Sequence, residues 1–269
     1  LTTPAMTKIG SSDVFAIKLD SSGNTTWVKN FGGSGASTSG GAIAVDNTGS
    51  VYLTGIFSSA NLTNPAFTKV GTQDAFAIKL DSSGNTTWSK KFHGATATAN
   101  VNWVSVDVSG NVYLSGFFSG ANLTSPALTK LGTSDALALK LDSSGNTTWS
   151  KNFGGSGATT YGDRIAFDES GNVFLSGTFS SANLTTPALT KIGSTDAFAL
   201  KLDSSGNTTW FKNFGGSGSS FSGVGIAVDG AGNILLGGYF SGANLTTPVT
   251  TKIGSTDAFA LKLDSSGNT

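Results

Sequence analysis

The 269-residue chain contains no cysteine, one histidine, one arginine and only 12% charged residues. Without cysteine it can form no disulfide, no thiolate metal site and no cysteine nucleophile. Its 16 lysine and arginine residues balance 16 aspartate and glutamate residues, and no basic cluster is present to neutralise phosphates. We therefore expect no nucleic-acid partner, no cofactor and no catalytic residue, because acid, base and nucleophile groups are scarce.

Long apolar runs are also missing. No segment reaches the length needed to span a bilayer. The opening residues 1–4 have neither the basic nor the apolar region of a signal peptide. We expect no membrane insertion within this chain, and we expect any export signal to lie outside it.

What the chain does have is an exact internal repeat. The segment Leu-Asp-Ser-Ser-Gly-Asn-Thr begins at five positions with a constant step of 61 residues: Leu19, Leu80, Leu141, Leu202 and Leu263. Cutting at this step gives copies 1–61, 62–122, 123–183 and 184–244 and a partial copy, 245–269. The sequence thus predicts a single tandem-repeat domain over residues 1–269.

The second copy shows the elements that each repeat contributes. Apolar residues alternate or run continuously, which predicts strands over residues 74–81 and 86–92 with a turn at 82–85. A second hairpin is predicted over 102–107 and 112–118, with Gly84 and Gly110 at turn positions that need positive φ. Residues 119–133 read as a long loop that has room for a short extra strand.

Four short strands per repeat predict an all-β fold. The first three strands carry apolar residues on both faces, as expected of a blade packed between neighbouring blades. We therefore expect a β-propeller built from 61-residue four-stranded repeats. A β-solenoid or another tandem β array is the alternative, although a solenoid coil normally takes only roughly 20 to 30 residues.

The repeat also resembles a known family. Residues 74–88, Asp-Ala-Phe-Ala-Ile-Lys-Leu-Asp-Ser-Ser-Gly-Asn-Thr-Thr-Trp, and residues 106–116, Val-Asp-Val-Ser-Gly-Asn-Val-Tyr-Leu-Ser-Gly, resemble the bacterial SBBP-type β-propeller repeat. The resemblance extends to every copy. It implies a propeller fold and an exported or surface protein without an assigned reaction.

The recurrent aspartates have two possible roles. One set precedes the Ser-Ser-Gly-Asn turns: Asp20, Asp81, Asp142, Asp203 and Asp264. Calcium loops gather several carboxylates on alternate residues, whereas each turn here has one, so we expect turn hydrogen bonds and no metal site. A second set is expected to anchor loop backbone where a strand starts: Asp13, Asp74, Asp135, Asp196 and Asp257.

Other recurrent residues also have two readings. Asn-x-Thr triplets, which accept glycans in eukaryotic secretory chains, occur at Asn24, Asn61, Asn85, Asn122, Asn146, Asn183, Asn207 and Asn244. For a repeat of bacterial type, turn chemistry is the simpler reading, with glycosylation as the alternative. The recurrent tryptophans indicate packing between blades before they indicate a sugar platform. The single histidine, His93, aligns with glycines in other copies, which indicates a tolerated loop substitution rather than a general base.

The copies differ most between the Gly-rich loop and the strand that follows it. In a propeller this segment would cross from an outermost strand to the next innermost strand, at the mouth of the channel, where ligand sites often lie. Neutral variation in an exposed loop is the alternative. The candidate ligand-binding residues are Asn100, Asn102, Trp103, Tyr161, Asp163, Arg164 and Phe221.

These observations favour a non-enzymatic structural or adhesive repeat protein, outside the cell or on a bacterial cell surface, that makes many weak contacts, including contacts with surface glycans. A glycan-binding propeller with one sugar per repeat is the first alternative. A hydrolase or lyase that uses the channel mouth is the second.

The number of strands creates a conflict at the ends. In a closed four-bladed ring the N-terminal hairpin would complete the blade begun by residues 225–240, and residues 257–264 would compete for the place of residues 13–20. We therefore expect the terminal copy, residues 245–269, to mediate self-association into filaments or the continuation of a longer array.

Overall fold

The computed structural model describes residues 5–269, and its regular structure consists of strands. Residues 1–4, which open the first copy and include Pro4, lie outside the described part. Among residues 5–269 there is no helix of the length and apolar character needed to cross a membrane. The prediction of an all-β chain is confirmed.

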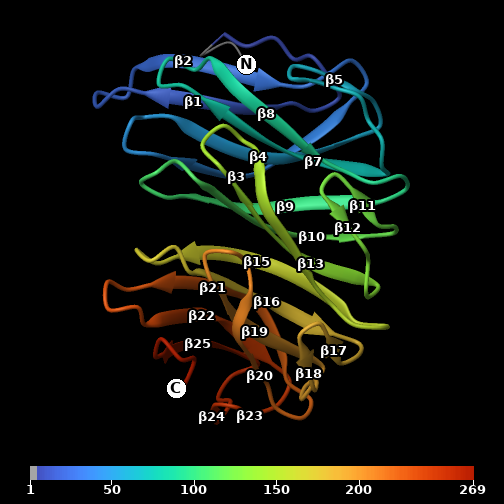
Figure 1. Ribbon diagram of the computed structural model, residues 1–269, viewed down its shortest axis with the longest axis vertical. Coiled ribbons are helices and arrows are strands. Elements are labelled where there is room, and N and C mark those ends of the chain that lie inside the picture. The colour runs from blue at the N-terminus through green and yellow to red at the C-terminus, as the bar shows by residue number, and fades with distance from the viewer. Residues whose placement is uncertain (1–4) are drawn as a thin grey trace.

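Three complete four-stranded blades follow one another along the described chain (Figure 1). Each is antiparallel, and its strands run in chain order from innermost to outermost. The first blade contains β3 (Ser37–Val45), β4 (Val51–Ser58), β7 (Gln73–Leu80) and β8 (Thr86–Phe92). The second contains β9 (Thr98–Val106), β10 (Val112–Ser119), β13 (Ser134–Leu141) and β14 (Thr147–Phe153). The third contains β15 (Thr159–Phe167), β16 (Val173–Ser180), β19 (Thr195–Leu202) and β20 (Thr208–Phe214).

Partial blades flank these three. The N-terminal one is a two-stranded sheet of β1 (Val14–Leu19) and β2 (Thr25–Phe31). The C-terminal one contains β21 (Ser220–Val228), β22 (Ile234–Ser241) and β25 (Thr256–Leu263). β9, which contains Trp103, is the innermost strand of the second blade, and β8, which contains Trp88, is the outermost strand of the first.

Successive blades are connected in the same way. The start of each third strand forms one parallel bridge with the start of the next innermost strand, as between Gln73 and Thr98. The innermost strands also contact one another, so that β9 lies between β3 and β15. In Figure 1 the described array is open, with β1 and β2 toward one end of its long axis and β25 toward the other.

The structure resolves the competition expected at the ends. β25 pairs with β22 along its whole length, from Ser241 opposite Thr256 to Ile234 opposite Leu263. The hairpin β1–β2 forms a separate sheet. Residues 257–264 are therefore not displaced, and they hold the third place in the last blade.

The innermost strands begin earlier than the apolar pattern predicts. β9 begins at Thr98, so the segment expected to be a crossing loop is the first half of a strand. A β-bulge at Asn102 interrupts the strand pattern: Ser115 pairs with Trp103 and Gly116 pairs with Val101, so Asn102 is the extra residue. The extra residue breaks the period of two on which strand recognition depends.

The segment predicted as a long loop contains two very short strands in each copy. These form hairpins β5–β6 (Leu62–Thr63, Ala66–Phe67), β11–β12 (Leu123–Thr124, Ala127–Leu128), β17–β18 (Leu184–Thr185, Ala188–Leu189) and β23–β24 (Leu245–Thr246, Val249–Thr250). Each hairpin is attached to the preceding Gly-rich loop. In the second copy the His93 carbonyl accepts from the Thr124 and Ser125 amides at 2.8 and 3.0 Å.

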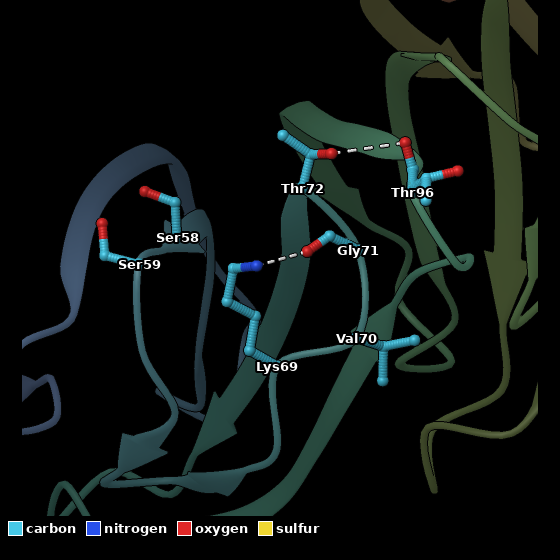
Figure 2. Close-up of a pocket in the computed structure, with 7 residues that line it drawn as sticks. All are labelled: Ser58, Ser59, Lys69, Val70, Gly71, Thr72 and Thr96. Carbon is cyan, nitrogen blue, oxygen red and sulfur yellow. Dashed lines mark hydrogen bonds between the residues drawn. The ribbon is translucent and has the colours of Figure 1, made fainter.

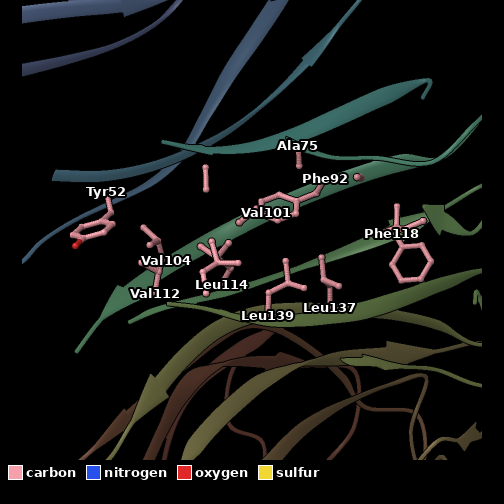
Figure 3. Close-up of a cluster of buried hydrophobic side chains, with 14 of the residues drawn as sticks. Tyr52, Ala75, Phe92, Val101, Val104, Val112, Leu114, Phe118, Leu137 and Leu139 are labelled. Atoms are coloured by element: carbon pink, nitrogen blue, oxygen red, sulfur yellow. The ribbon is translucent and has the colours of Figure 1, made fainter. Parts of the chain in front are cut away.

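The hydrophobic core lies between neighbouring blades. Figure 3 shows Tyr52 and Ala75 of the first blade facing Val104, Leu114 and other apolar residues of the second. Similar clusters lie on the other blade faces. Because burying each Val, Leu or Phe side chain contributes roughly 1.5 to 3 kcal/mol, each blade depends on its neighbours for stability.

Candidate functional site

Each Asp-Ser-Ser-Gly-Asn turn is closed by its own aspartate. The Asp81 carboxylate accepts hydrogen bonds from the backbone amides of Ser83 and Asn85 at 2.9 and 2.8 Å and from the Asn85 side chain at 3.0 Å. The bonds from Asn85 contribute most to holding the pKa of Asp81 below its ordinary value. The arrangement recurs at Asp20, Asp142, Asp203 and Asp264. The turn role predicted for these aspartates is confirmed.

The second set of aspartates anchors the loop before each third strand. Asp74 is buried, and its two carboxylate oxygens accept from the amides of Val70 and Gly71, both at 2.8 Å. The equivalent pairs of bonds form at Asp13, Asp135, Asp196 and Asp257. The predicted anchoring of loop backbone is confirmed.

A third aspartate closes the turn between the innermost and second strands. The Asp46 carboxylate accepts from the Tyr52 hydroxyl at 2.9 Å and from the amides of Thr48 and Ser50. Burial alone would raise the pKa of Asp46, but these bonds and one from the Thr48 hydroxyl outweigh it and lower the pKa to about 2. The carboxylate therefore stabilises the turn in its ionised form.

The recurrent tryptophans pack between blades. Trp88 on β8 donates from its indole Nε1 to the Ser143 carbonyl of the next blade at 3.1 Å. Its ring covers Gly145, where an added Cβ would lie 2.8 Å from Trp88 Cδ2. The same indole bond recurs at Trp27, Trp149 and Trp210. Packing between blades, the first of the two readings, is confirmed.

The Asn-x-Thr triplets have structural contacts in the described chain. Asn85 donates from its side chain to Asp81, while Asn122 accepts from the Lys130 amide at 2.8 Å. Equivalent side-chain bonds occur at Asn24, Asn61, Asn146, Asn183, Asn207 and Asn244. Turn chemistry explains these residues, and glycosylation stays a prediction.

Lys91 near the end of β8 and His93 directly after β8 distinguish the second copy. The Thr124 hydroxyl lies 3.4 Å from Nδ1 of His93, whose pKa is lowered by burial and then by the charge of Lys91. Lys91 lies 3.6 Å from Asp74 and donates to the Thr68 carbonyl. In the next copy Asn152 bonds the equivalent groups, the Thr129 carbonyl and Asp135. These contacts show that His93 and Lys91 have structural partners in the fold.

The sequence predicts the candidate ligand-binding residues on crossing loops, but the structure places them on innermost strands. Asn100, Asn102 and Trp103 lie on β9, and the third-copy candidates lie on β15. Asn102 and Asp163 are the bulged residues of their strands. Each bulge turns a side chain toward the next blade: Asn102 donates to the Gly162 carbonyl at 3.1 Å, and Asp163 accepts from the Val224 amide at 3.3 Å.

Two aromatic contacts occupy the junction between the second and third blades. The Arg164 guanidinium lies 4.2 Å from the Trp103 ring centroid, a cation–π contact. The Tyr161 and Phe117 rings meet edge to face with centroids 4.7 Å apart. The structure thus brings the candidates of the second and third copies together across β9 and β15.

Phe221 does not belong to this group. It is buried in the last blade, where its ring lies 5.9 Å from Phe240 and 5.2 Å from Phe259, centroid to centroid. The variable segment forms part of a strand, and side chains along a strand point alternately to its two faces. This alternation directs Phe221 into the core of the last blade. The expectation that Phe221 lies at a channel mouth is therefore wrong, because its side chain packs in the core.

A small polar hollow lies between the innermost strands of the first and second blades. Its volume is about 160 Å³. Its lining residues are Ser39, Gly40, Gly41, Gly55, Ile56, Asn100, Val101 and Asn102. Two of the predicted candidates therefore line a hollow, and the other five do not line this one.

Gln73 is a site residue that the candidate set lacks. It donates from Nε2 to the side-chain oxygen of Asn100 at 3.1 Å, which fixes that amide beside the hollow. The other copies have serine or threonine at this position: Ser12, Ser134, Thr195 and Thr256. The comparison between copies that identifies Asn100 would therefore also identify Gln73.

A larger hollow of about 500 Å³ lies at the ends of the blades (Figure 2). Ser58 and Ser59 lie on one side and Thr72 and Thr96 on the other, with Lys69 donating to the Gly71 carbonyl between them. The lysine contact recurs at Lys130, Lys191 and Lys252. This hollow is therefore largely part of the repeat architecture.

Stacked blades that recur with a 61-residue step define the chain as a protein of β-propeller repeats. Three of its segments match the SBBP family, a beta-propeller repeat: residues 26–55, 148–184 and 209–245. These matches confirm the resemblance to the SBBP-type β-propeller repeat.

A curated viral protein is also similar. An uncharacterized WD repeat-containing protein of Acanthamoeba polyphaga mimivirus is 25% identical over 206 residues. The match covers 64% of this chain and 15% of the viral protein, so this chain spans a small part of that relative's length. Together with the SBBP match, this similarity supports a repeat protein.

Proposed function

We propose that this chain is a non-enzymatic structural or adhesive repeat protein whose two end faces pack against further repeats, either in other copies of the chain or in a longer array. The supporting observation is the exposure of apolar residues at the two ends of the described array. Phe15 on β1 is 55% exposed, whereas its counterpart Phe76 is fully buried in the first blade. Leu235 on β22 is 44% exposed, whereas its counterpart Phe174 is fully buried.

The two exposed faces correspond to faces that pack against neighbouring blades inside the array. Inside the array, the face that contains Phe76 packs against the preceding blade, and the face that contains Phe174 packs against the following one. The N-terminal face of one chain is thus suited to the C-terminal face of another. Such a head-to-tail contact repeats and produces chains of molecules unless the rotation closes a ring.

The recurrent polar groups support a structural role. The repeated aspartates, asparagines and tryptophans bond to turns and neighbouring blades. The bonds within the Asp-Ser-Ser-Gly-Asn turns lower the pKa of the turn aspartates, as at Asp81, and fix their carboxylates, whereas acid–base catalysis requires proton exchange with a substrate. A hydrolase or lyase therefore stays the less favoured function.

An extracellular or cell-surface location is part of this proposal. It is supported by the low charge and the many serine, threonine and asparagine side chains, which suit multivalent contact at low affinity per contact. Labelling of intact producing cells with a membrane-impermeant reagent tests it. Labelling only after lysis would contradict the location.

Sedimentation velocity over a range of concentrations tests the association. The parent chain is expected to form larger species as concentration rises, and Phe15→Lys is expected to shift the equilibrium toward monomer. Val108→Lys is the matched control, because Val108 is 88% exposed on a turn away from the end faces. A parent that stays monomeric, or equal assembly of parent and Phe15→Lys, would refute end-to-end association.

A further inference from the structure

We propose that the outer edge of β25 binds an extended segment of another polypeptide, and that an aromatic side chain of this segment enters an apolar hollow beside the edge. The segment is defined by its chemistry: it is a strand of the same repeat that resembles β20, Thr-Thr-Trp-Phe-Lys-Asn-Phe. The inference rests on the proposed packing against further repeats, but it concerns an edge of the last blade, whereas that packing concerns the end faces.

The edge of β25 is open in the described chain. β25 pairs with β22 on one side, and no strand of residues 5–269 pairs with its other side. The identical sequence in β19 pairs with β20 at the corresponding edge, over residues Ala197–Leu202. Backbone amides and carbonyls at an open edge can bind an extended peptide as one more strand.

β25 is held in place without this additional strand. Its pairing with β22 extends over all eight residues of the strand. The turn that follows is closed by Asp264, which accepts from the amides of Ser266 and Asn268, both at 2.9 Å. Trp210 of the third blade donates to the Ser265 carbonyl of the same turn at 3.1 Å. An edge that is already ordered loses little conformational entropy on binding, which favours affinity.

The edge lacks features that protect edge strands from further pairing. β25 contains no proline, and its register with β22 has no bulge. Its lysine, Lys262, does not prevent pairing, because Lys201 at the same position of β19 lies opposite Trp210 in the paired strand. The sequence of β25 is therefore suited to pairing on both sides.

An apolar hollow of about 200 Å³ lies beside this edge. Three of its lining residues have counterparts one repeat earlier: Phe214, Leu245 and Phe259 correspond to Phe153, Leu184 and Phe198. In the third blade the ring of Phe211 on β20 packs on this earlier set, with its centroid 6.4 Å from that of Phe153 and 5.3 Å from that of Phe198. The hollow is thus the place that an aromatic residue of a fourth strand would fill.

Thr250 gives the hollow room for a large side chain. It is one of the lining residues, and the other copies have larger apolar residues at its position: Phe67, Leu128 and Leu189. In the first copy, which has Phe67, the fourth strand has the small residue Ser89 at the position of Phe211. The small residue at position 250 therefore favours an added strand with a large residue at the position of Phe211.

NMR titration of the full chain with a synthetic peptide of residues 207–214 tests the proposal. The peptide is expected to shift the amides of β25 and to slow their hydrogen exchange. A Phe211→Ser peptide, which copies Ser89 of β8, is expected to bind about tenfold more weakly because it leaves the hollow empty, a loss of about 1.4 kcal/mol. In the chain, Thr250→Phe is expected to weaken binding of the parent peptide and to leave binding of the serine peptide unchanged.

Val249→Phe is the matched control, because Val249 is the neighbour of Thr250 in β24 and is 87% exposed. Thermal melting verifies that both variants fold, and the serine peptide provides the test on the unaltered chain if Thr250→Phe does not. Phe15→Lys separates this site from end-to-end association, since it is expected to leave the affinity for the peptide unchanged.

Three results would overturn the proposal. The first is that the peptide does not bind to the folded chain. The second is that it shifts the amides of β1 or β19 and not those of β25. The third is that the serine peptide binds to the parent chain as tightly as the phenylalanine peptide does.

Discussion

At the scale of single residues, the repeated side chains act over short distances. An aspartate bonds amides two and four residues away, and the glycine of its turn adopts positive φ, as at Gly84 with φ 83°. Such contacts join residues that are close in the sequence, so the turns could be predicted from the sequence. The partner of each tryptophan could not, because Trp88 reaches Ser143, 55 residues further along the chain.

The contact of tryptophan with turn glycine gives the first residue-scale prediction. Gly206 has φ +81°, and an added Cβ would lie 2.9 Å from Trp149 Cδ2. Gly206→Ala is expected to lower the free energy of unfolding by about 1 to 2 kcal/mol for the left-handed backbone and by about 1 to 3 kcal/mol more for the displaced ring. Chemical denaturation measures the sum.

Gly23 provides a matched control for that measurement. It occupies the same turn position with φ +82°, but nothing lies within 4 Å of its added Cβ. Gly23→Ala is therefore expected to show the backbone cost alone. If the two variants lose the same free energy, the contact between Trp149 and the Gly206 turn does not help to hold the next blade.

At the scale of elements, the period of two predicts the hairpins and fails at the bulges. Residues 86–92 match β8 at both ends. The start of β9 is missed because Thr98, Asn100 and Asn102 are polar and the bulge interrupts alternation. The candidate residues were therefore identified correctly as the variable part of the repeat, but their place in the fold needed the structure.

The bulge in β15 makes a prediction about pH. Burial raises the pKa of Asp163, and the Val224 amide and Arg164 offset this only in part. An acid with a raised folded pKa stabilises the fold below its unfolded pKa, and that contribution is lost as pH rises through the folded value. Asp163→Asn keeps an acceptor without charge, so its Tm is expected to exceed that of the parent at neutral pH and to approach it below about pH 4.

Asp46→Asn is the control of opposite sign. The pKa of Asp46 is lowered to about 2, so its carboxylate stabilises the fold above the ordinary value of 3.8 and less as pH falls toward 2. This variant is expected to melt below the parent at neutral pH, with the difference shrinking in acid. Parallel pH profiles for the two variants would show that burial of Asp163 does not control its ionisation.

At the scale of the whole molecule, identical sequences occupy different environments. β19 and β25 have the same eight residues, Thr-Asp-Ala-Phe-Ala-Leu-Lys-Leu. β19 is paired on both sides, with β16 and β20, and five consecutive residues from Asp196 to Leu200 are buried. β25 is paired with β22, and its residues alternate between exposed and half-buried up to Leu263. Sequence alone cannot separate the two, because the difference lies in their neighbours.

The strands β19 and β25 give a final prediction, about amide hydrogen exchange, in which differences in sequence have no influence because the two sequences are identical. Because intrinsic exchange rates are equal for equal sequences, any difference in amide hydrogen exchange by NMR reports local opening. The amides of β25 are expected to exchange faster than those of β19 at low concentration, since fewer strand contacts must open. If chains associate end to end, protection of β25 rises with concentration while that of β19 stays constant. Equal protection at every concentration would mean that the last blade is as stable as the central ones, and the exposed face of β22 and β25 would then need no partner.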